Sequence, residues 1–505
     1  MVSKLFSMSF YGLKIIPIEI EVDIQVKVIN FEIVGMAGPA VKESVKRIET
    51  AIQNSGFHFP GKRIIVNLAP AGIKKVGTLF DLPIALGILN EQYEFNNLND
   101  YLLVGELSMD GQLRSIAGAL PIAYQAKSCG FKKIICPLKN APEMSIVEDI
   151  EIYPVSSLTE AVNFLGGNIN ISPYKNQKEA LIFKPENSML DMSDIKGQES
   201  AKRALEICSA GGHNALMIGP PGTGKTMLAK RLPTILPEMT LEEALETTMI
   251  YSVAGLINHE KPLILERPFR TPHHTASDVS IIGGGKFPKP GEVSLAHNGV
   301  LFLDEIQLFR SNVLQVLRQP LEDRKISISR AEGSVEFPGN FILVAALNPS
   351  KNNTDIDQWE TKDMLSLMKK VSSPLLDRID IHIQVPRIKF DQIQSKASSE
   401  TSMEIKKRVI KARQIQYDRL KRYSLYTNSQ MSHKLIEEFC CLNKSGESLL
   451  RLAMEKFLLS IRAYDKILKV ARTVADLEEK EKIEDYHISE ALQYRILDRI
   501  LNFTN

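Results

Sequence analysis

One short glycine-rich segment constrains the fold of this chain more than any other feature. Residues 219–226 read GPPGTGKT, between an apolar run, NALMI, and a segment, TMLAKRLPTI, whose pattern predicts a helix. Glycines at these positions let backbone N–H groups curl around phosphate oxygens, and the start of a helix favours negative charge. A strand, a loop and a helix in this order predict a P-loop, which binds the phosphates of a nucleotide.

The residues of this predicted P-loop have separate expected roles. Lys225 is expected to contact the β- and γ-phosphates of ATP, and the Thr226 hydroxyl is expected to ligate Mg²⁺. The alternative is a chance glycine-rich turn, against which the flanking strand and helix argue. The residues expected to bind the nucleotide are Gly219, Pro220, Pro221, Gly222, Thr223, Gly224, Lys225 and Thr226.

Two further apolar segments end in polar residues that would complete an ATPase site. GVLFLDE, residues 299–305, ends in Asp304 and Glu305, the pattern called Walker B. We expect Asp304 to hold the metal, directly or through water, and Glu305 to polarise the attacking water. FILVAALNP, residues 341–349, places Asn348 at a strand end, where it is expected to position that water, the sensor-1 role of AAA+ ATPases. A strand-terminating Asn-Pro turn is also expected there, and it is compatible with this role.

Two arginines are candidates for contact with the transferring phosphoryl group. Arg378 lies in SSPLLDRIDIHI, and Arg462 lies at the start of the predicted helix RAYDKILKVARTVADL. An ATPase that works as a ring needs an arginine from the neighbouring subunit, and we assign this role to Arg378. The alternative is a local ion pair with Asp377 or Asp380. Arg462 is expected to act as sensor 2 from a helical lid, with a solvated helix arginine as the alternative.

Composition places the chain among ordinary soluble globular proteins. Its 505 residues suggest about three domains. With 62 basic and 60 acidic residues, it cannot bind nucleic acid by bulk charge, so such binding requires local patches. Five scattered cysteines without a C-x2-C pair are typical of a reduced, cytoplasmic protein. No signal-peptide pattern or apolar run of about 18 residues is present, so no membrane span is expected.

The chain divides by pattern into four stretches. Residues 9–35 read as strands, VKESVKRIETAIQNSG reads as a helix, KRIIVNLAPAG as a strand and DLPIALGILN as a buried helix. A polar stretch without periodicity follows, then a second α/β unit, and after Pro386 the pattern is almost entirely helical. The predicted divisions are an α/β domain at 1–167, a linker at 168–190, a P-loop α/β core at 191–388 and a helical lid at 389–505.

Taken together, the motifs resemble the magnesium-chelatase-like AAA+ proteins of the ComM/YifB type. The resemblance rests on GPPGTGKT, RPFRTPHHTAS, GEVSLAHNGVLFLDE, LRQPLED, PLLDRIDIH and RAYDKILKVARTVADL, and on FEIVGMAGPAVKESVKRIETAIQNSG, FDLPIALGIL and VGELSMDGQLRSIAGALP near the N-terminus. It covers nearly the whole chain. It implies an α/β multidomain fold: a Lon-protease-like (ribosomal S5 domain 2-like) domain, an AAA+ core and a chelatase-type helical lid. It also implies a hexameric ring that uses ATP and Mg²⁺ on single-stranded, forked or four-way DNA, as a branch-migration helicase in recombination or natural transformation.

The resemblance also shows where this chain departs from its relatives. A Lon peptidase needs a serine and a lysine. Where the peptidase has G-P-S-A-G, this chain has GTLFD at residues 77–81, which puts Leu79 at the serine position, and Leu120 lies near the position of the lysine. We therefore interpret the domain as non-proteolytic. Ser108 and Lys75 lie off that pattern. Many relatives carry a cysteine-rich segment after the sensor-1 asparagine, whereas this chain has no cysteine there and has Trp359. Ser373 replaces a glycine in the family's SGPLLDRID.

Two loops are candidates for DNA contact inside a ring. RPFRTPHHTAS and SIIGGGKFPKPGE carry the first set of candidates, and KISISRAEGSVEFPGNF predicts a hairpin with a turn at residues 332–333. Basic side chains there would follow phosphates without reading sequence. Structural loops that pack subunits together are the alternative. For the paired histidines, a structural or phosphate-contact role is favoured over a metal, because no third ligand has suitable spacing. The candidate DNA contacts are Arg267, Arg270, His273, His274, Lys286 and Arg330.

Other readings of the chain remain open. EIKKRVIKARQIQYDRLKRY carries eight basic and two acidic residues, which predicts a solvated helix face or an outer DNA contact. The main functional prediction is an ATP-driven DNA motor. The alternatives are a magnesium-chelatase-type ATPase subunit acting on a porphyrin, and a degenerate relative that binds ATP and assembles without moving DNA. No stable protein partner and no membrane contact are expected.

Overall fold

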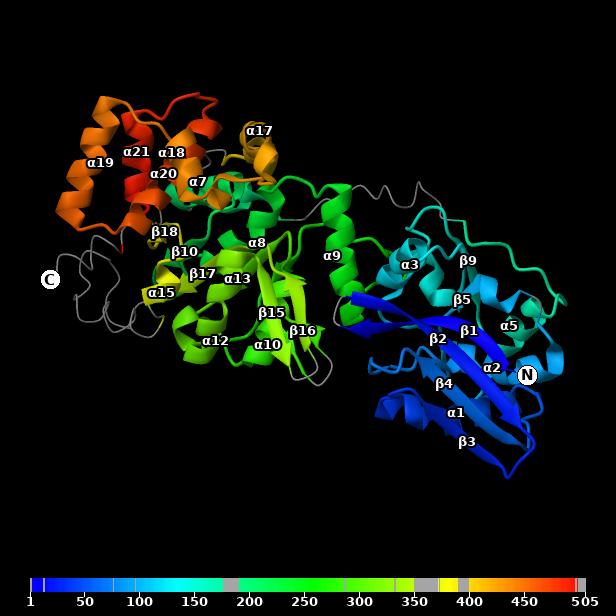
Figure 1. Ribbon diagram of the computed structural model, residues 1–505. Coiled ribbons are helices and arrows are strands. Elements are labelled where there is room, and N and C mark those ends of the chain that lie inside the picture. The colour runs from blue at the N-terminus through cyan, green and yellow to red at the C-terminus, as the bar shows by residue number, and fades with distance from the viewer. Residues whose placement is uncertain are drawn as a thin grey trace.

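The chain forms an N-terminal α/β unit, a central α/β unit and a C-terminal group of helices (Figure 1). The computed structural model describes residues 2–11, 14–75, 77–95, 97–175, 190–285, 288–330, 333–348, 371, 373–388, 399–495 and 497. In Figure 1 the N-terminal unit, blue to cyan, lies at the right, and the C-terminal helices, orange to red, lie at the upper left. Helix α9 (Leu241–Ala254) stands between the central and N-terminal units.

The N-terminal unit is built on a seven-stranded sheet in the order β3-β4-β2-β1-β5-β8-β9. Alternate residues of β2, Ile18, Ile20 and Val22, are buried in its core, as the period of two in the sequence requires. The sheet strands are β1 (Val2–Tyr11), β2 (Lys14–Gln25), β3 (Asn30–Val34), β4 (Arg63–Ala69), β5 (Tyr101–Leu103), β8 (Lys133–Pro137) and β9 (Glu151–Val155), with β6 (Glu106–Leu107) and β7 (Leu113–Arg114) as a small separate ribbon. Its helices are α1 (Pro39–Asn54), α2 (Asp81–Tyr93), α3 (Ala119–Ser128), α4 (Ala141–Met144) and α5 (Leu158–Leu165).

The strands and helices predicted for this unit are confirmed. Two of the strand pairings in the sheet run antiparallel. β1 pairs with β2, and β2 pairs with β4, in antiparallel register. The remaining neighbours in the sheet pair in parallel. Helix α2 is buried over Asp81–Leu89, because its apolar residues cover its whole circumference.

The central unit contains a five-stranded parallel sheet in the order β11-β14-β17-β10-β18. Every residue of the three middle strands is buried, as expected for a sheet covered on both faces. Alternate residues enter two separate cores, with Met217 on one face and Leu216 on the other. The strands are β10 (Ala215–Ile218), β11 (Phe269–Arg270), β14 (Val300–Leu303), β17 (Ile342–Leu347) and β18 (Ile381–Gln384).

Short helices and two small ribbons surround this sheet. The predicted hairpin is confirmed, since β15 (Lys325–Arg330) pairs antiparallel with β16 (Gly333–Pro338). A second ribbon joins β12 (Gly283–Gly284) to β13 (Lys289–Pro290). The helices are α7 (Glu199–Gly211), α8 (Lys225–Ile235), α9, α10 (Asp278–Ile282), α11 (Glu292–Leu295), α12 (Ser311–Val316), α13 (Arg318–Asp323) and α15 (Ser373–Leu376).

The helical C-terminal region shares one hydrophobic core with α7 and one face of the central sheet. Ile405 and Ile467 of this region lie in the same buried cluster as Leu205 of α7 and Val300 of β14. The region is therefore packed onto the central unit through a continuous apolar contact. It consists of α17 (Ser402–Leu420), α18 (His433–Phe439), α19 (Lys444–Phe457), α20 (Ile461–Leu477) and α21 (Asp485–Gln493).

A buried polar contact joins the N-terminal unit to the central one. The backbone N–H of Gly118 donates to the Ser252 carbonyl of α9 over 2.9 Å, and the Ser252 hydroxyl donates to the Glu143 carboxylate. Glu143 also accepts from the Leu120 backbone N–H at 2.9 Å. Burial raises the pKa of Glu143 above its usual range. These bonds connect α3 and α4 to the helix that borders the central sheet.

The mixed α/β fold, with its parallel sheet and helical C-terminal region, agrees with the predicted fold class. The described residues include no helix that is both long and apolar enough to cross a membrane. Of the predicted linker at 168–190, residues 176–189 lie outside the described residues.

We expect Asp476→Ala to destabilise the helical region. Asp476 is fully buried and accepts hydrogen bonds from Arg419, Arg472 and Asn428. Its loss leaves buried guanidinium groups unpaired, which costs about 3 kcal/mol. Asp418→Ala is the control, because that carboxylate is exposed and water screens its pair with Lys421, so its loss should change the stability little. The urea midpoint of the full chain measures both effects, and equal midpoints in the two variants would contradict this account.

Candidate active site

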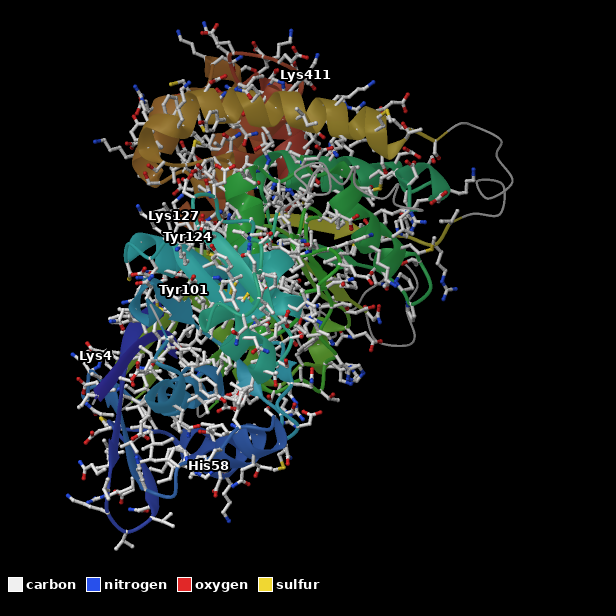
Figure 2. All side chains as sticks on the ribbon, turned by 90° about the vertical axis from the view of Figure 1, so that its right-hand side faces the viewer. Lys4, His58, Tyr101, Tyr124, Lys127 and Lys411 are labelled. Atoms are coloured by element: carbon white, nitrogen blue, oxygen red, sulfur yellow. The ribbon has the colours of Figure 1, made fainter. Side chains whose placement is uncertain are left out.

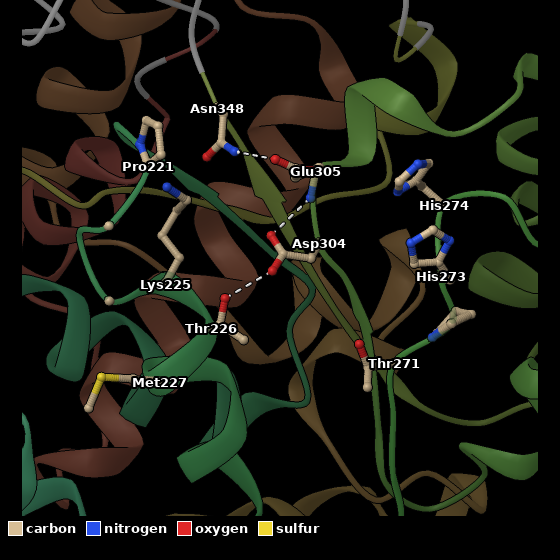
Figure 3. A pocket seen from close by; sticks show the side chains of 13 residues that line it. Pro221, Lys225, Thr226, Met227, Thr271, His273, His274, Asp304, Glu305 and Asn348 are labelled. Carbon is tan, nitrogen blue, oxygen red and sulfur yellow. Dashed lines mark hydrogen bonds between the residues drawn. The ribbon is translucent and has the colours of Figure 1, made fainter.

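A cavity of about 640 Å³ opens at the carboxyl edge of the parallel sheet (Figure 3). Because the middle strands run in one direction, the segments that follow them meet at this edge. The P-loop follows β10, Asp304 and Glu305 follow β14, and Asn348 follows β17. The cavity is lined by Pro221, Gly222, Gly224, Lys225, Thr226, Met227, Thr271, Pro272, His273, His274, Asp304, Glu305 and Asn348.

The first and last glycines of the P-loop fit positions that a side chain would disturb. A Cβ built on Gly219 would lie 2.1 Å from the Val385 carbonyl oxygen, so the loop could not pack against the end of β18. Gly224 has a φ of 92°, in the left-handed region that favours glycine, and it precedes the first residue of α8. The backbone therefore turns sharply into the helix and directs its first N–H groups toward the cavity.

Lys225 lies against the P-loop backbone. Its Nζ donates to the carbonyl oxygens of Gly219 and Pro220, each at 2.7 Å. The side chain is buried, and burial lowers its pKa, while the charges of Asp304 and Glu305 act in the opposite direction. A phosphate in the cavity would supply stronger acceptors than these neutral carbonyls.

Thr226 and Asp304 lie next to each other, as a shared metal ligand set requires. The Thr226 hydroxyl donates to Asp304 Oδ2 over 2.9 Å, from the first turn of α8 to the end of β14. Hydroxyl and carboxylate oxygens suit Mg²⁺, which keeps several waters and bonds to substrate phosphates. Within the described ranges, no group of three or more His, Cys, Asp or Glu residues forms a closed metal site. The residues therefore fit Mg²⁺ that enters together with a nucleotide.

Glu305 is held in an unusual backbone conformation beside Asn348. Its φ of 51° and ψ of 50° lie in the left-handed region, which is costly for a residue with a side chain. Asn348 Nδ2 donates to Glu305 Oε1 at 3.0 Å, and the Glu305 N–H donates to Asp304 Oδ1 at 3.0 Å. The second carboxylate oxygen of Glu305 has no such contact with Asn348. Together these contacts orient a carboxylate toward the cavity, where a water molecule would need a base.

The two predicted arginines lie outside this cavity. Arg378 pairs with Glu322 at 2.5 Å and donates to the Pro374 carbonyl at 2.6 Å, so its partner is not the predicted alternative, Asp377 or Asp380. Arg462 is exposed in the first turn of α20. Neither residue is among the described residues that line the cavity. The sensor-2 role of Arg462 stays a prediction, since this residue does not line the cavity of its own chain.

The two arginines nevertheless belong to one region of the surface. Lys466, four residues after Arg462 on α20, donates to the backbone carbonyls of Asp377 and Ile379, which flank Arg378. This contact fixes the start of α20 against the segment that follows α15. Burial lowers the pKa of Lys466 to about 8, while the charge of Asp380 acts in the opposite direction. The contact therefore fixes the backbone that carries the exposed Arg462 relative to the backbone that carries the half-buried Arg378.

Two of the candidate DNA contacts, Arg267 and Arg270, have partners within the protein. All five N–H groups of Arg267 donate hydrogen bonds within the protein. The acceptors are the Glu243 carboxylate and the carbonyls of Pro237, Glu238 and Asn298. The side chain thereby connects α9 to the segment before β11. Arg270 forms a two-point ion pair with Glu292 at 2.7 and 2.8 Å. Both guanidinium groups thus have structural partners.

The remaining candidates differ in what the structure describes. His273 and His274 line the cavity beside Asp304 and Glu305, which places them at the candidate nucleotide site. Arg330 ends β15, and its side chain, like the whole of Lys286, lies outside the described residues. Trp359 and the segment that would carry the relatives' cysteines lie outside them as well.

The basic run of α17 is largely neutralised by neighbours. Arg408 pairs with Glu206 and Glu400, and Arg419 pairs with Asp476. Lys411, at the outer surface in Figure 2, pairs with Glu479 at 2.9 Å. The local charge therefore supports the solvated helix face over an outer DNA contact.

The N-terminal unit has a leucine, Leu79, where a Lon peptidase has its serine, and this side chain is buried. Thr78 donates its hydroxyl hydrogen to Glu106, and Leu120 is fully buried in α3. Lys75 is also buried, and its Nζ donates to the carbonyls of Gly35 and Pro70. Ser108 bonds to Asp110 at an exposed turn.

The fold and the cavity define a magnesium-chelatase-like AAA+ protein. The family models "Magnesium chelatase, subunit ChlI", "Subunit ChlI of Mg-chelatase" and "Magnesium chelatase, subunit ChlI C-terminal" match residues 191–393, 20–140 and 399–495. The chain is 42% identical to the competence protein ComM of Haemophilus influenzae over 98% of both chains. It is 40% identical to the uncharacterized protein YifB of Salmonella typhimurium, over 97% of this chain and 96% of YifB.

These similarities extend over essentially the full length, so the chain belongs to the ComM/YifB-type family of magnesium-chelatase-like proteins. It is also 30% identical to Lon protease 2 of Bacillus subtilis over 154 residues, 28% of this chain and 27% of that protein. This partial similarity agrees with a Lon-like unit within a larger AAA+ architecture.

We expect Gly219→Ala to disturb the P-loop before any ligand is present. The new methyl group meets the Val385 backbone, which cannot rotate away, and such overpacking costs about 1–3 kcal/mol. The melting temperature should therefore fall. Gly72→Ala is the matched control, because a Cβ at Gly72 has nothing within 4 Å. Identical melting temperatures for the two variants would show that the close approach at Gly219 is tolerated.

Proposed function

We propose that this chain is the subunit of an ATP-driven ring, most simply a hexamer, that moves along or remodels DNA during recombination or natural transformation. In this proposal ATP and Mg²⁺ bind in the cavity at the sheet edge, and each subunit acts on single-stranded, forked or four-way DNA. The observation that carries the proposal is the division of the site: one chain assembles the residues for binding and water activation, while its two candidate arginines lie elsewhere.

Nucleotide binding and activation of the attacking water would use residues of one chain. Lys225 and the P-loop N–H groups would hold the phosphates, and Thr226 and Asp304 would hold Mg²⁺, which neutralises charge that develops on the phosphoryl group. Glu305 would accept the proton of the attacking water. Asn348 keeps one oxygen of that carboxylate occupied, which leaves the other to face the water.

Turnover would require a second subunit. Charge on the transferring phosphoryl group is stabilised by an arginine in many P-loop ATPases, and such an arginine raises kcat by several orders of magnitude. Because Arg378 and Arg462 share a surface region away from their own cavity, we propose that they reach the cavity of the neighbouring subunit. Hydrolysis would then depend on assembly.

Similarity and shape support DNA as the substrate. One full-length relative is named a competence protein, and this name supports the proposal of DNA as the substrate. The β15–β16 hairpin packs on the core of the central unit through Ile326 and Phe337, and it is the element that would face a ring channel (Figure 1). The fused N-terminal unit and the full-length match favour this proposal over a chelatase subunit, since the Rhodobacter capsulatus magnesium-chelatase 38 kDa subunit matches only 44% of this chain.

Forked DNA tests the proposal. We expect it to stimulate ATP hydrolysis by the wild-type chain about tenfold or more, and ATP should drive strand displacement, because translocation couples the two. Lys225→Ala should lose nucleotide binding and both activities, whereas Glu305→Gln should bind ATP without turning it over. Absence of both stimulation and displacement by the wild-type chain would contradict a DNA motor. Metal insertion into a porphyrin would favour the chelatase alternative instead.

A further inference from the structure

His273 and His274 form a wall of the cavity that the ATPase motifs do not account for. They follow β11, the edge strand, which pairs in parallel with β14 through Phe269 and Val300. The carboxyl end of β11 therefore opens at the same sheet edge as the P-loop and the acidic pair. In Figure 3 both rings lie on the far side of Asp304 and Glu305 from Lys225.

The segment that carries these histidines is anchored at both sides. Arg270, three residues earlier, is fixed by its two-point ion pair with Glu292, and that hydrogen bond raises the pKa of the guanidinium. On the other side, the Ala276 N–H donates to the His273 carbonyl at 2.9 Å and closes a turn. The two rings are thus carried by an anchored loop, so little conformational entropy of this loop is lost when the rings bind a ligand.

The contacts of His273 indicate which ring nitrogen carries the proton. The Thr275 backbone N–H, which can only donate, points to Nδ1 at 3.4 Å, and the Thr275 hydroxyl lies 2.8 Å from the same atom. Nδ1 therefore acts as an acceptor, and in the neutral ring the proton sits on Nε2. The His274 ring packs against this ring with a centroid distance of 4.1 Å. His273 thus carries an Nε2–H donor in the wall that it forms with His274, and the P-loop lines the same cavity.

We propose that His273 and His274 donate hydrogen bonds to the terminal phosphate of bound ATP and so let the site distinguish ATP from ADP. This inference rests on the proposed function, because it assumes that the P-loop holds the nucleotide. Lys225 and the P-loop approach the phosphates from one side, and the histidines face them from the other (Figure 3). ADP lacks the phosphate that would lie nearest Glu305. The two histidines would therefore donate no hydrogen bond to ADP and would not strengthen its binding.

The test compares a non-hydrolysable ATP analogue with ADP, each bound in the presence of Mg²⁺. For the double variant His273→Ala/His274→Ala we expect about tenfold weaker binding of the analogue and no change for ADP, since a hydrogen bond to a charged group is worth about that factor. His273→Gln keeps an N–H donor and should retain part of the discrimination. His58→Ala, an exposed histidine of the N-terminal unit (Figure 2), is the matched control.

The possible results separate this inference from the proposed function. Selective loss of analogue binding supports the histidine wall. Two results overturn it. In one, the double variant binds both nucleotides as the wild-type chain does. In the other, it loses the same factor of affinity for both, which would mean that the loop only shapes the pocket. If the wild-type chain binds neither nucleotide, the proposed ATPase function itself fails.

Discussion

The common direction of five strands is the constraint on which the site depends. Because β10, β11, β14 and β17 all end at one edge, four segments far apart in sequence converge on one cavity. The hydrogen bond from Thr226 to Asp304 closes this arrangement between the first turn of α8 and the end of β14. If one of these strands ran in the opposite direction, the polar residues after it would lie at the other edge of the sheet, about a strand length from the cavity.

The same edge is connected to the rest of the molecule through α9. Glu243 near the start of this helix binds Arg267, just before β11, and Ser252 near its end binds Glu143 of the N-terminal unit. One helix thus lies between the wall of the nucleotide cavity and the neighbouring unit. The C-terminal helices are joined to the sheet more directly, through the shared apolar core around α7.

The sequence allowed the P-loop, the acidic pair and Asn348 to be placed because each follows an apolar run long enough to recognise. It did not allow His273 and His274 to be placed, because β11 has only two residues and no periodic pattern. Arg267 shows a second limit: its charge suggested a ligand contact, but its acceptors are mostly backbone carbonyls, which leave no trace in the sequence. Arg378 pairs with Glu322, which lies far from it along the chain. The sequence suggested Asp377 or Asp380 as partners only because they are its neighbours in sequence.

In the mechanism that we propose, one chain binds ATP but needs a neighbour to hydrolyse it. Mixing two inactive variants tests this most directly: Arg378→Ala supplies an intact Glu305, and Glu305→Gln supplies an intact Arg378. Each variant alone should bind ATP and lack turnover. The account predicts that assembled mixtures recover ATP hydrolysis, because some sites pair the two intact residues across a subunit boundary. Mixtures that assemble and remain inactive would show that both residues must come from the same chain and would contradict it.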